Sequence, residues 1–181
     1  MTPFGILAPA QILFGRGEAA KAPRLIQGFG ARGVVVHGAS AARAQGLVDQ
    51  LRAEGAEVLT LSCATEPTVP MLEAAIAEAR AFGALWVAAL GGGAVLDMGK
   101  ALAAMVPAPA GMMDHLEVVG KGLPLSAAPL PFIALPTTSG TGAEATKNAV
   151  IGVPEHGRKV SLRDDRMLAR IAIVDPALTD H

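Results

Sequence analysis

The sequence predicts a doubly wound α/β fold, in which helices cover both faces of a mostly parallel, Rossmann-like sheet. Short apolar runs alternate with amphipathic helical stretches, which is the pattern of strands buried on both faces. Hydrophobic residues make up 51% of the chain but aromatic residues only 3%, so small side chains that suit close helix–sheet packing dominate. A length of 181 residues suffices for one core and is marginal for two. We therefore expect a single domain over residues 1–181.

The first half of the chain is expected to form an N-terminal β-hairpin and then alternating helices and strands. Two short apolar segments, at residues 4–7 and 11–14, flank a proline-containing turn and predict the hairpin. Ser40 is expected to cap the helix after the first parallel strand. The expected strands are residues 34–36, 58–61 and 85–90, and the expected helices are residues 17–27, 41–54, 70–82 and 97–105.

The last third of the chain is less regular. Residues 114–131 are rich in glycine and proline and predict a loop, and residues 132–135 predict a buried strand that ends in a polar segment. Residues 148–153 and 158–162 predict a hairpin, and residues 171–174 predict a last strand.

Charge and cysteine content exclude several classes of partner and compartment. The net charge is −1 and there is no basic run, so neither a nucleic acid nor an anionic membrane is expected as a partner. No apolar run approaches the roughly 20 residues that a membrane helix needs. The apolar start of the chain lacks a basic segment and is broken by Pro3 and Pro9, so it is a poor signal peptide. A single cysteine, Cys63, cannot form an internal disulfide, and a cytoplasmic protein is expected.

Three consecutive glycines, Gly91-Gly92-Gly93, lie between an apolar strand and the helix behind it. A phosphate needs main-chain N–H groups and little steric bulk, and glycines at a strand-to-helix turn supply both. The spacing is not the common dinucleotide fingerprint, because Leu96 stands where a third glycine is needed, and Lys100 comes too late for a P-loop. The context favours phosphate binding over a bare turn. Asp97, in the first helical turn, either offsets the helix dipole or bonds a ribose hydroxyl or a loop N–H.

A second polar loop, Pro136-Thr137-Thr138-Ser139-Gly140-Thr141-Gly142-Ala143-Glu144, follows another buried strand. Its four hydroxyls can satisfy pyrophosphate and ribose oxygens without adding charge. Taken alone, the loop favours an ordinary Ser/Thr/Gly turn that caps a helix near Glu144. Taken with the glycine triplet, it predicts that two turns, around residues 91 and 137, converge on one diphosphate.

The two loops and several later landmarks together resemble the iron-containing alcohol dehydrogenase family. No single landmark is specific, but they occur in the order of the family and spread over most of the chain. Besides the two loops with Asp97 and Lys100, they are Glu66-Pro67-Thr68-Val69, Leu116-Glu117-Val118-Val119-Gly120, Asn148-Ala149-Val150, Lys159-Val160-Ser161-Leu162-Arg163 and Val174-Asp175-Pro176 with Leu178-Thr179.

The resemblance implies that residues 1–181 are a dinucleotide-binding domain for NAD or NADP. In the family the glycine triplet holds the pyrophosphate, and threonines of the later loop contact the phosphates and the nicotinamide side. Ala94 replaces the usual serine, so only its N–H carries over. The cofactor-binding positions implied are Gly38, Ser40, Thr68, Gly92, Gly93, Ala94, Asp97, Thr137, Thr138, Thr141, Thr146 and Lys159.

Gly38 follows the first parallel strand, where members of the family that favour NAD carry an acidic residue. Such a residue bonds the ribose hydroxyls and repels a 2′-phosphate, whereas Gly38 supplies no repulsion and Ser40 can bond either form. The choice between NAD and NADP therefore stays open at this stage.

The family also binds iron(II) or another divalent metal through one aspartate and three histidines on a following helical domain, which we expect to be absent from this chain. His37, His115, His156 and His181 do not pair at helical spacing and are interpreted as surface or loop residues. Cys63 has no evident activating partner. We therefore expect neither a metal ligand nor a catalytic residue here, and no alcohol oxidation by this chain alone.

The resemblance implies hydride exchange between NAD(P) and a small-molecule alcohol or its carbonyl product, and it is compatible with a homo-oligomer. One alternative is a relative of the maleylacetate reductases or glycerol dehydrogenases. A second alternative, from another class, is a non-catalytic nucleotide-binding module. The module predicts a polar surface where a further domain would dock, and the dehydrogenase predicts an apolar or pre-organised face near the threonine loop and the C-terminus.

Overall fold

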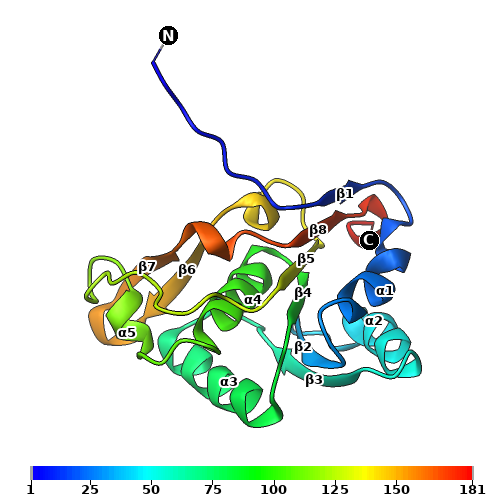
Figure 1. Ribbon diagram of the computed structural model, residues 1–181, viewed down its shortest axis with the longest axis horizontal. Helices are drawn as coiled ribbons and strands as arrows, with labels where there is room; N and C mark the ends of the chain where they lie inside the picture. Colours follow the sequence, from blue (N-terminus) through cyan, green and yellow to red (C-terminus); the bar gives the residue numbers. More distant parts are fainter. Residues whose placement is uncertain (1, 181) are drawn as a thin grey trace.

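A six-stranded parallel sheet forms the centre of the computed structural model, which describes residues 2–180 (Figure 1). The order across the sheet is β1-β8-β5-β4-β2-β3, and every pairing within it is parallel. This arrangement confirms the expected doubly wound sheet. The strands are β1 (Ile12–Phe14), β2 (Arg32–His37), β3 (Glu57–Ser62), β4 (Val87–Gly91), β5 (Phe132–Pro136) and β8 (Ile171–Val174).

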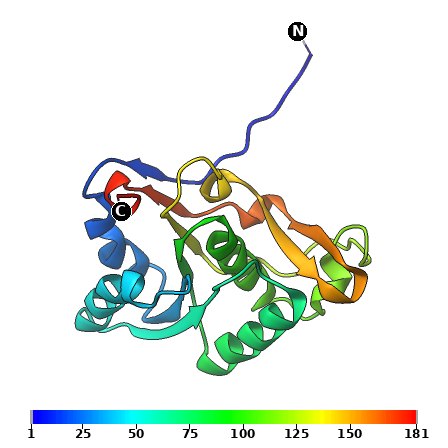
Figure 2. The ribbon, with the colours of Figure 1, turned by 180° about the vertical axis from the view of Figure 1, so that it is seen from behind.

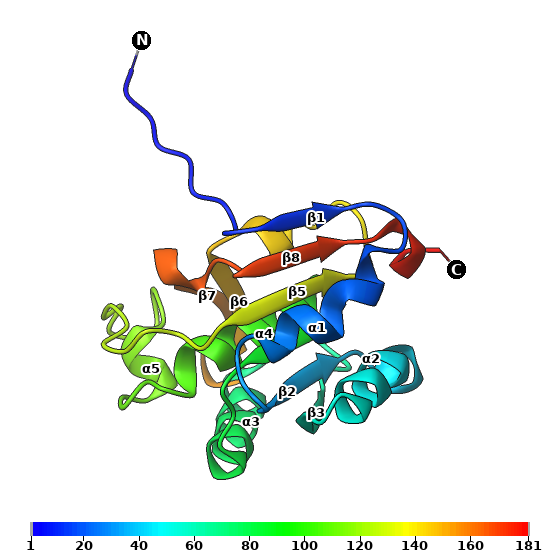
Figure 3. The ribbon, with the colours of Figure 1, turned by 45° about the vertical axis from the view of Figure 1, so that its right-hand side comes forward.

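Helices cover both faces of this sheet, and each face has its own apolar core (Figure 3). Helices α3 and α4 pack on one face, and α1 and α2 pack on the other. Successive residues of β2 serve opposite faces, since Val34 and Val36 join the first core and Val35 joins the second. The α-helices are α1 (Ala22–Gln27), α2 (Ala42–Ala53), α3 (Val69–Phe82), α4 (Gly93–Met105) and α5 (Met112–His115).

A small antiparallel hairpin lies beside the main sheet, as the sequence predicts. It consists of β6 (Asn148–Val153) and β7 (Arg158–Arg163), which pair from Asn148↔Arg163 to Val153↔Arg158. Gly157 closes the turn with a φ of 56°, a left-handed conformation that favours glycine. The short 3-10 helices are η1 (Glu18–Lys21), η2 (Ala143–Ala145), η3 (Pro154–His156), η4 (Asp165–Met167) and η5 (Pro176–Leu178).

The predicted N-terminal hairpin is wrong. Residues 4–7 form no strand and lead away from the body as an extended segment (Figures 1 and 2). The expected second strand is β1, and it pairs in parallel with β8 instead. The main-chain groups around β1 are bonded to the C-terminal part of the chain, since Ala10 N–H donates to Ala169 O and Gln11 O accepts from Ala172 N–H. Strand β1 therefore pairs with β8, far along the sequence, and not with the neighbouring residues 4–7.

The first predicted helix is divided in two. Residues 18–21 form η1, and α1 begins at Ala22 with Pro23 in its first turn. Proline fits the first turn of a helix, where its missing N–H is not needed, but it does not continue one. Within residues 2–180, no helix is long and apolar enough to cross a membrane.

Candidate nucleotide-binding site

The two predicted turns leave neighbouring strands at the same edge of the sheet. Strands β4 and β5 pair in register up to Gly91↔Pro136, and Thr137 N–H donates to Gly91 O at 3.0 Å. The glycine turn and the threonine loop also face each other, because a Cβ built on Gly92 would lie 3.2 Å from Thr138 Oγ1. The two turns therefore lie side by side, as expected, and their binding of one diphosphate stays a prediction.

The glycines are required for different reasons. At Gly91 an added Cβ would lie 2.6 Å from the Val95 Cβ, so the tight passage from β4 into α4 admits only glycine. At Gly93 the added Cβ would lie 3.4 Å from the Thr141 Cβ, in the space between the two loops. Gly92 is the N-cap residue of α4 and provides no side-chain cap. The first N–H groups of this helix therefore point out of the carboxyl edge of the sheet, with the partial positive charge of the helix dipole behind them.

A cavity of about 260 Å³ opens beside these turns, at the carboxyl ends of β2 and β4. The connection from β2 leads outward to β3, whereas the connection from β4 leads the other way to β5. Ligands of open α/β sheets bind outside the strands at such a reversal. The cavity is lined by Gly38, Ala39, Ser40, Arg43, Leu90, Gly91 and Thr137.

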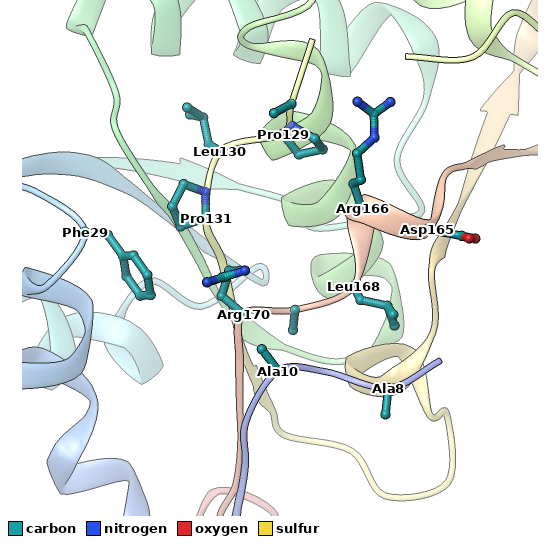
Figure 4. Close-up of a pocket in the computed structure, with 12 residues that line it drawn as sticks. Ala8, Ala10, Phe29, Pro129, Leu130, Pro131, Asp165, Arg166, Leu168 and Arg170 are labelled. Atoms are coloured by element: carbon teal, nitrogen blue, oxygen red, sulfur yellow. The ribbon is translucent and has the colours of Figure 1, made fainter. Parts of the chain in front are cut away.

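A larger hollow of about 520 Å³ lies at the opposite end of the sheet (Figure 4). It is lined by Pro131 and Arg170, which precede β5 and β8, and by Phe29 and Arg166. The amino ends of parallel strands do not offer the helix N-termini that bind phosphate. The smaller cavity at the carboxyl edge is therefore the better nucleotide site.

A buried ion pair fastens α4 to the threonine loop and to β6. Lys100 Nζ, fully buried, donates to Asn148 O at 2.6 Å and to Thr146 Oγ1 at 3.0 Å, and it lies 3.4 Å from Asp97 Oδ1. Asp97 Oδ2 accepts the Val150 N–H at 3.1 Å. Burial raises the pKa of Asp97 and lowers the pKa of Lys100, and the attraction between the two charges opposes both shifts.

This cluster corrects two expectations about Asp97. Because α4 begins at Gly93, Asp97 lies in the second helical turn and not in the first, so it is poorly placed to offset the helix dipole. Its carboxylate bonds a backbone N–H, as one interpretation expected, but that N–H belongs to β6. Thr146 likewise uses its hydroxyl within the protein, as an acceptor for Lys100.

Two other predicted residues, Thr68 and Lys159, meet at Gly152 of β6. Thr68 precedes α3 and forms a parallel bridge with Gly152, and Lys159 is the partner of Gly152 in the hairpin. The Lys159 ammonium forms an ion pair with Glu66, and both side chains are largely exposed.

Gly38 and Ser40 line the cavity beside β2, but Ser40 is not the cap of α2. The helix is preceded by Ala41, which already has helical angles and makes no side-chain cap. The Gly38 carbonyl lies 2.7 Å from His37 Nδ1 and 3.3 Å from Ser62 Oγ. These contacts fix the end of β2 beside the glycine turn.

The interpretation of the histidines as surface or loop residues is wrong for two of them. His37 and His115 are 7% and 5% exposed. His37 ends a central strand that has neighbours on both sides, and His115 lies 2.9 Å from Leu123 O within the folded excursion after α4. His156 is exposed, and His181 lies outside the described residues. Within residues 2–180, no group of three or more His, Cys, Asp or Glu side chains is placed to hold a metal ion.

Cys63 lies behind the glycine turn and is buried. Its thiol is 3.1 Å from Thr65 O and 3.6 Å from Ala94 O. Burial, with a smaller contribution from the Asp97 charge, raises the pKa of the thiol to about 11. The thiol therefore stays protonated near neutral pH and is a poor nucleophile.

Arg43 was not identified as a site residue from the sequence. It lies in the first turn of α2, three residues after Ser40, and it lines the cavity at the end of β2. Its position three residues after Ser40 was the one indication in the sequence that Arg43 could border the same cavity, because residues three apart at a helix start lie on one side of the helix.

The family model described as "Iron-containing alcohol dehydrogenase" matches residues 9–176. The chain is 36% identical over 136 residues to the probable alcohol dehydrogenase EutG of Escherichia coli (strain K12), covering 75% of this chain and 33% of the relative. It is 38% identical over 139 residues to long-chain-alcohol dehydrogenase 1 of Geobacillus thermodenitrificans, covering 74% of this chain and 34% of the relative.

A solved structure shows the same fold. The sulfoacetaldehyde reductase from Bifidobacterium kashiwanohense in complex with NAD⁺ superimposes with a TM-score of 0.85 at 29% identity, over 99% of this chain and 48% of that chain. The present chain thus spans about a third of the two curated relatives and about half of the solved structure.

Proposed function

Because this chain belongs to the iron-containing alcohol dehydrogenase family, we propose that residues 1–181 are the domain that holds NAD or NADP while a hydride passes between the cofactor and an alcohol or its carbonyl product. One observation carries the proposal: the glycine turn after β4 and the threonine loop after β5 lie side by side at the carboxyl edge of the sheet. A diphosphate needs this combination of main-chain N–H groups and hydroxyls within a small space.

The proposal assigns roles to the converging turns. The N–H groups of Gly92, Gly93 and Ala94 donate to the diphosphate, and the hydroxyls of Thr138 and Thr141 complete its coordination by hydrogen bonds. These groups bind without adding charge, so the negative diphosphate is stabilised mainly by the dipoles of oriented amides and of α4.

Lys159 and the Asp97 cluster have different proposed roles. Lys159 reaches the cofactor after leaving Glu66, which costs little because an exposed ion pair contributes about 0–1 kcal/mol. Asp97, Lys100 and Thr146 hold the threonine loop against α4 from within the protein, and they support the site without touching the cofactor.

The metal of the family does not fit the described residues. No cluster of suitable ligands is present within residues 2–180. We propose that the ligands lie in the part of the relatives that this chain does not span, and that the chain by itself does not oxidise alcohols. Incubation with iron(II), a short alcohol and NAD⁺ or NADP⁺ should give no reduced cofactor. Turnover that requires iron would contradict this.

Apolar surface near the C-terminus supports an enzyme domain over a self-contained module. Phe14, on the edge strand β1, is 75% exposed. Ile12, on the same strand, is 53% exposed, and β1 lies beside β8 near the end of the chain. Exposed apolar surface of this kind is expected where a further domain packs. A cytoplasmic location is proposed because the chain has a single cysteine, Cys63, which cannot form an internal disulfide.

Titration of the purified chain with NADH and NADPH, followed by the fluorescence of the reduced nicotinamide, tests the proposed cofactor role. Gly92→Asp should weaken binding of both more than tenfold, since its carboxylate would face the diphosphate. Gly111→Asp is the matched control: it adds the same charge before α5, where a Cβ meets no atom within 4 Å. Equal loss of binding in both variants, or no binding by the unmodified chain, would refute the role.

A further inference from the structure

We propose that the hollow of about 520 Å³ at the amino ends of the strands is a second binding site of this domain, which takes a small carboxylate with an apolar aryl or alkyl body. Arg170 binds the carboxylate, and the apolar walls hold the body. The hollow lies at the end of the sheet opposite the glycine turn, so this site does not depend on the proposed nucleotide role.

The walls of the hollow come from both faces of the sheet. Pro131 and Arg170 directly precede β5 and β8, which are neighbours in the sheet. Phe29, between α1 and β2, packs against the core on one face, and Leu130 packs against the core on the other. The volume lies within the roughly 300–1,000 Å³ that is usual for small-molecule sites.

The main-chain groups of these walls offer a ligand few hydrogen bonds. Pro129 and Pro131 have no N–H. The Leu130 N–H donates to Ala103 O at 2.9 Å, and the Ala10 N–H is also bonded within the protein. A sugar or another strongly polar ligand would lose its hydrogen bonds to water here without replacing them, so the body of the ligand must be apolar.

Two charged residues of the walls are already paired. Arg166 Nη2 lies 2.7 Å from Asp164 Oδ2, and Asp165 Oδ1 accepts from Lys147 Nζ at 2.5 Å. Figure 4 shows the Asp165 side chain directed away from the apolar residues. Among residues 2–180, the charge that remains in the walls is therefore the guanidinium of Arg170.

Arg170 combines a fixed main chain with an uncommitted side chain. Its N–H donates to Phe132 O at 2.8 Å, which holds the residue at the start of β8. Within residues 2–180, neither an ion pair nor a hydrogen bond engages its guanidinium. Figure 4 shows this group in the same hollow as the side chains of Pro131 and Phe29.

A single uncommitted guanidinium fits a carboxylate better than a phosphate. It can donate two parallel hydrogen bonds to the two oxygens of a carboxylate and match its one negative charge. A phosphate carries more than one negative charge near neutral pH and needs donors that these walls do not offer. Because Arg170 is exposed, the carboxylate should lie where the hollow opens to solvent, with the apolar body behind it.

Calorimetric titration of the 181-residue chain with 4-phenylbutyrate and with 4-phenylbutanamide tests the proposal, because the two probes share a shape and differ in charge. The carboxylate should bind about five- to tenfold more tightly than the amide, a modest ratio because the ion pair is exposed. Arg170→Gln keeps a hydrogen-bonding group and removes the charge, so it should lower the affinity for the carboxylate to that for the amide. Arg158→Gln, at an exposed arginine outside the hollow, is the matched control and should keep the ratio.

Chemical-shift changes in NMR spectra locate the bound probe. They should appear at Phe29, Leu168 and Arg170, which line the hollow. Ala128→Trp places a large side chain at an exposed position of the wall and should abolish binding of both probes. Added salt should weaken binding of the carboxylate and leave binding of the amide unchanged, since salt screens an exposed ion pair.

Several results would overturn the proposal. These are equal affinity for the two probes, an unchanged ratio in Arg170→Gln, affinity for the carboxylate that does not respond to salt, and shift changes centred on the glycine turn. Absence of saturable binding by a chain whose fold is confirmed by circular dichroism would also overturn it. Arg170→Met replaces Arg170→Gln if the latter does not fold.

Discussion

Replacing Lys100 with methionine should destabilise the domain by about 3–5 kcal/mol, the usual cost of removing one partner of a buried ion pair. Lys100 is 1% exposed, and its ammonium contacts Asp97, Thr146 and Asn148. Methionine fills a similar volume with a flexible apolar chain, so the variant removes the charge and its hydrogen bonds with little change in packing.

Two effects contribute to the expected loss of folding stability in Lys100→Met. The Asp97 side chain is only 15% exposed and would keep its negative charge without a nearby cation. The carbonyls of Thr146 and Asn148 would each lose a donor, at about 1–3 kcal/mol for a group that stays buried. Thr146 is exposed, so water replaces part of that loss. A total of about 3–5 kcal/mol is a large share of the roughly 5–15 kcal/mol that stabilises a typical domain.

The pH dependence provides a second readout of the same pair. Burial already raises the pKa of Asp97, and Lys100 opposes that rise, so the variant should raise the pKa further. A carboxyl whose folded pKa lies above its unfolded value takes up protons more readily in the folded state. The stability of Lys100→Met should therefore increase as the pH falls through the raised pKa toward 3.8.

Urea unfolding of a double-mutant cycle measures the coupling. Asp97→Asn keeps a side-chain oxygen for the Val150 N–H and removes the charge. The double variant should be more stable than the sum of the single effects predicts, by about 0.5–3 kcal/mol, with unchanged m values. Lys21→Met, at an exposed ion pair, should change the stability by less than about 1 kcal/mol. Additive effects in the cycle, or a loss below about 1 kcal/mol in Lys100→Met, would refute the reasoning.

Three further predictions concern packing, acid stability and the end of a helix. Gly99→Ala would place a Cβ 2.7 Å from the Ala89 Cβ and should cost about 1–3 kcal/mol in urea unfolding, whereas Gly46→Ala, on the open side of α2, should stabilise by up to about 1 kcal/mol. Burial pushes the pKa of Asp175 upward, but hydrogen bonds from backbone N–H groups, with a smaller attraction from Arg16, outweigh it and hold the pKa below its usual value. The contribution of Asp175 to stability is therefore full above pH 3.8 and is lost as the pH falls further. Asp175→Asn should therefore lower stability at pH 7 and leave it nearly unchanged in strong acid, and an equal loss at both pH values would contradict this. Arg80 donates to three carbonyls at the end of α4, so Arg80→Ala should speed amide exchange in the last turn of α4, and unchanged exchange there would argue against this role.

The buried strands were predictable from the sequence because each is nearly continuous in apolar residues. A parallel strand covered on both faces has no polar side, and its ends are marked by glycine or polar turns. For this reason the predicted run at residues 171–174 coincides with β8, and the hairpin of β6 and β7 was also found. Boundaries moved where proline or glycine altered the helix start, as at Pro23 and Gly93.

The features that were missed depend on partners far along the chain. The N-terminal hairpin was wrong because β1 pairs with β8, about 160 residues later. Asp97 bonds the Val150 N–H, 53 residues away, which the position of Asp97 in its helix could not indicate. Burial of His37 follows from the strand order, which places β2 between β3 and β4.

The glycine turn and the threonine loop were predictable as motifs, but their adjacency follows from the pairing of β4 with β5. The place of Arg43 could not be read from the sequence, because the cavity that it lines is formed by segments from three different strand ends. The two motifs were therefore easier to predict than the cavity beside them.

Because Cys63 lies behind the glycine turn, the opening of this turn can be followed by the rate of thiol modification, with no need to introduce a cysteine. Cys63 is the single cysteine of the chain, and it is buried against Ala94 O, so a thiol reagent reaches it only when the turn opens. The modification rate, divided by that of an unfolded peptide, then gives the fraction of time that the turn is open. A bound dinucleotide that clamps the turn would slow this reaction in proportion to its occupancy.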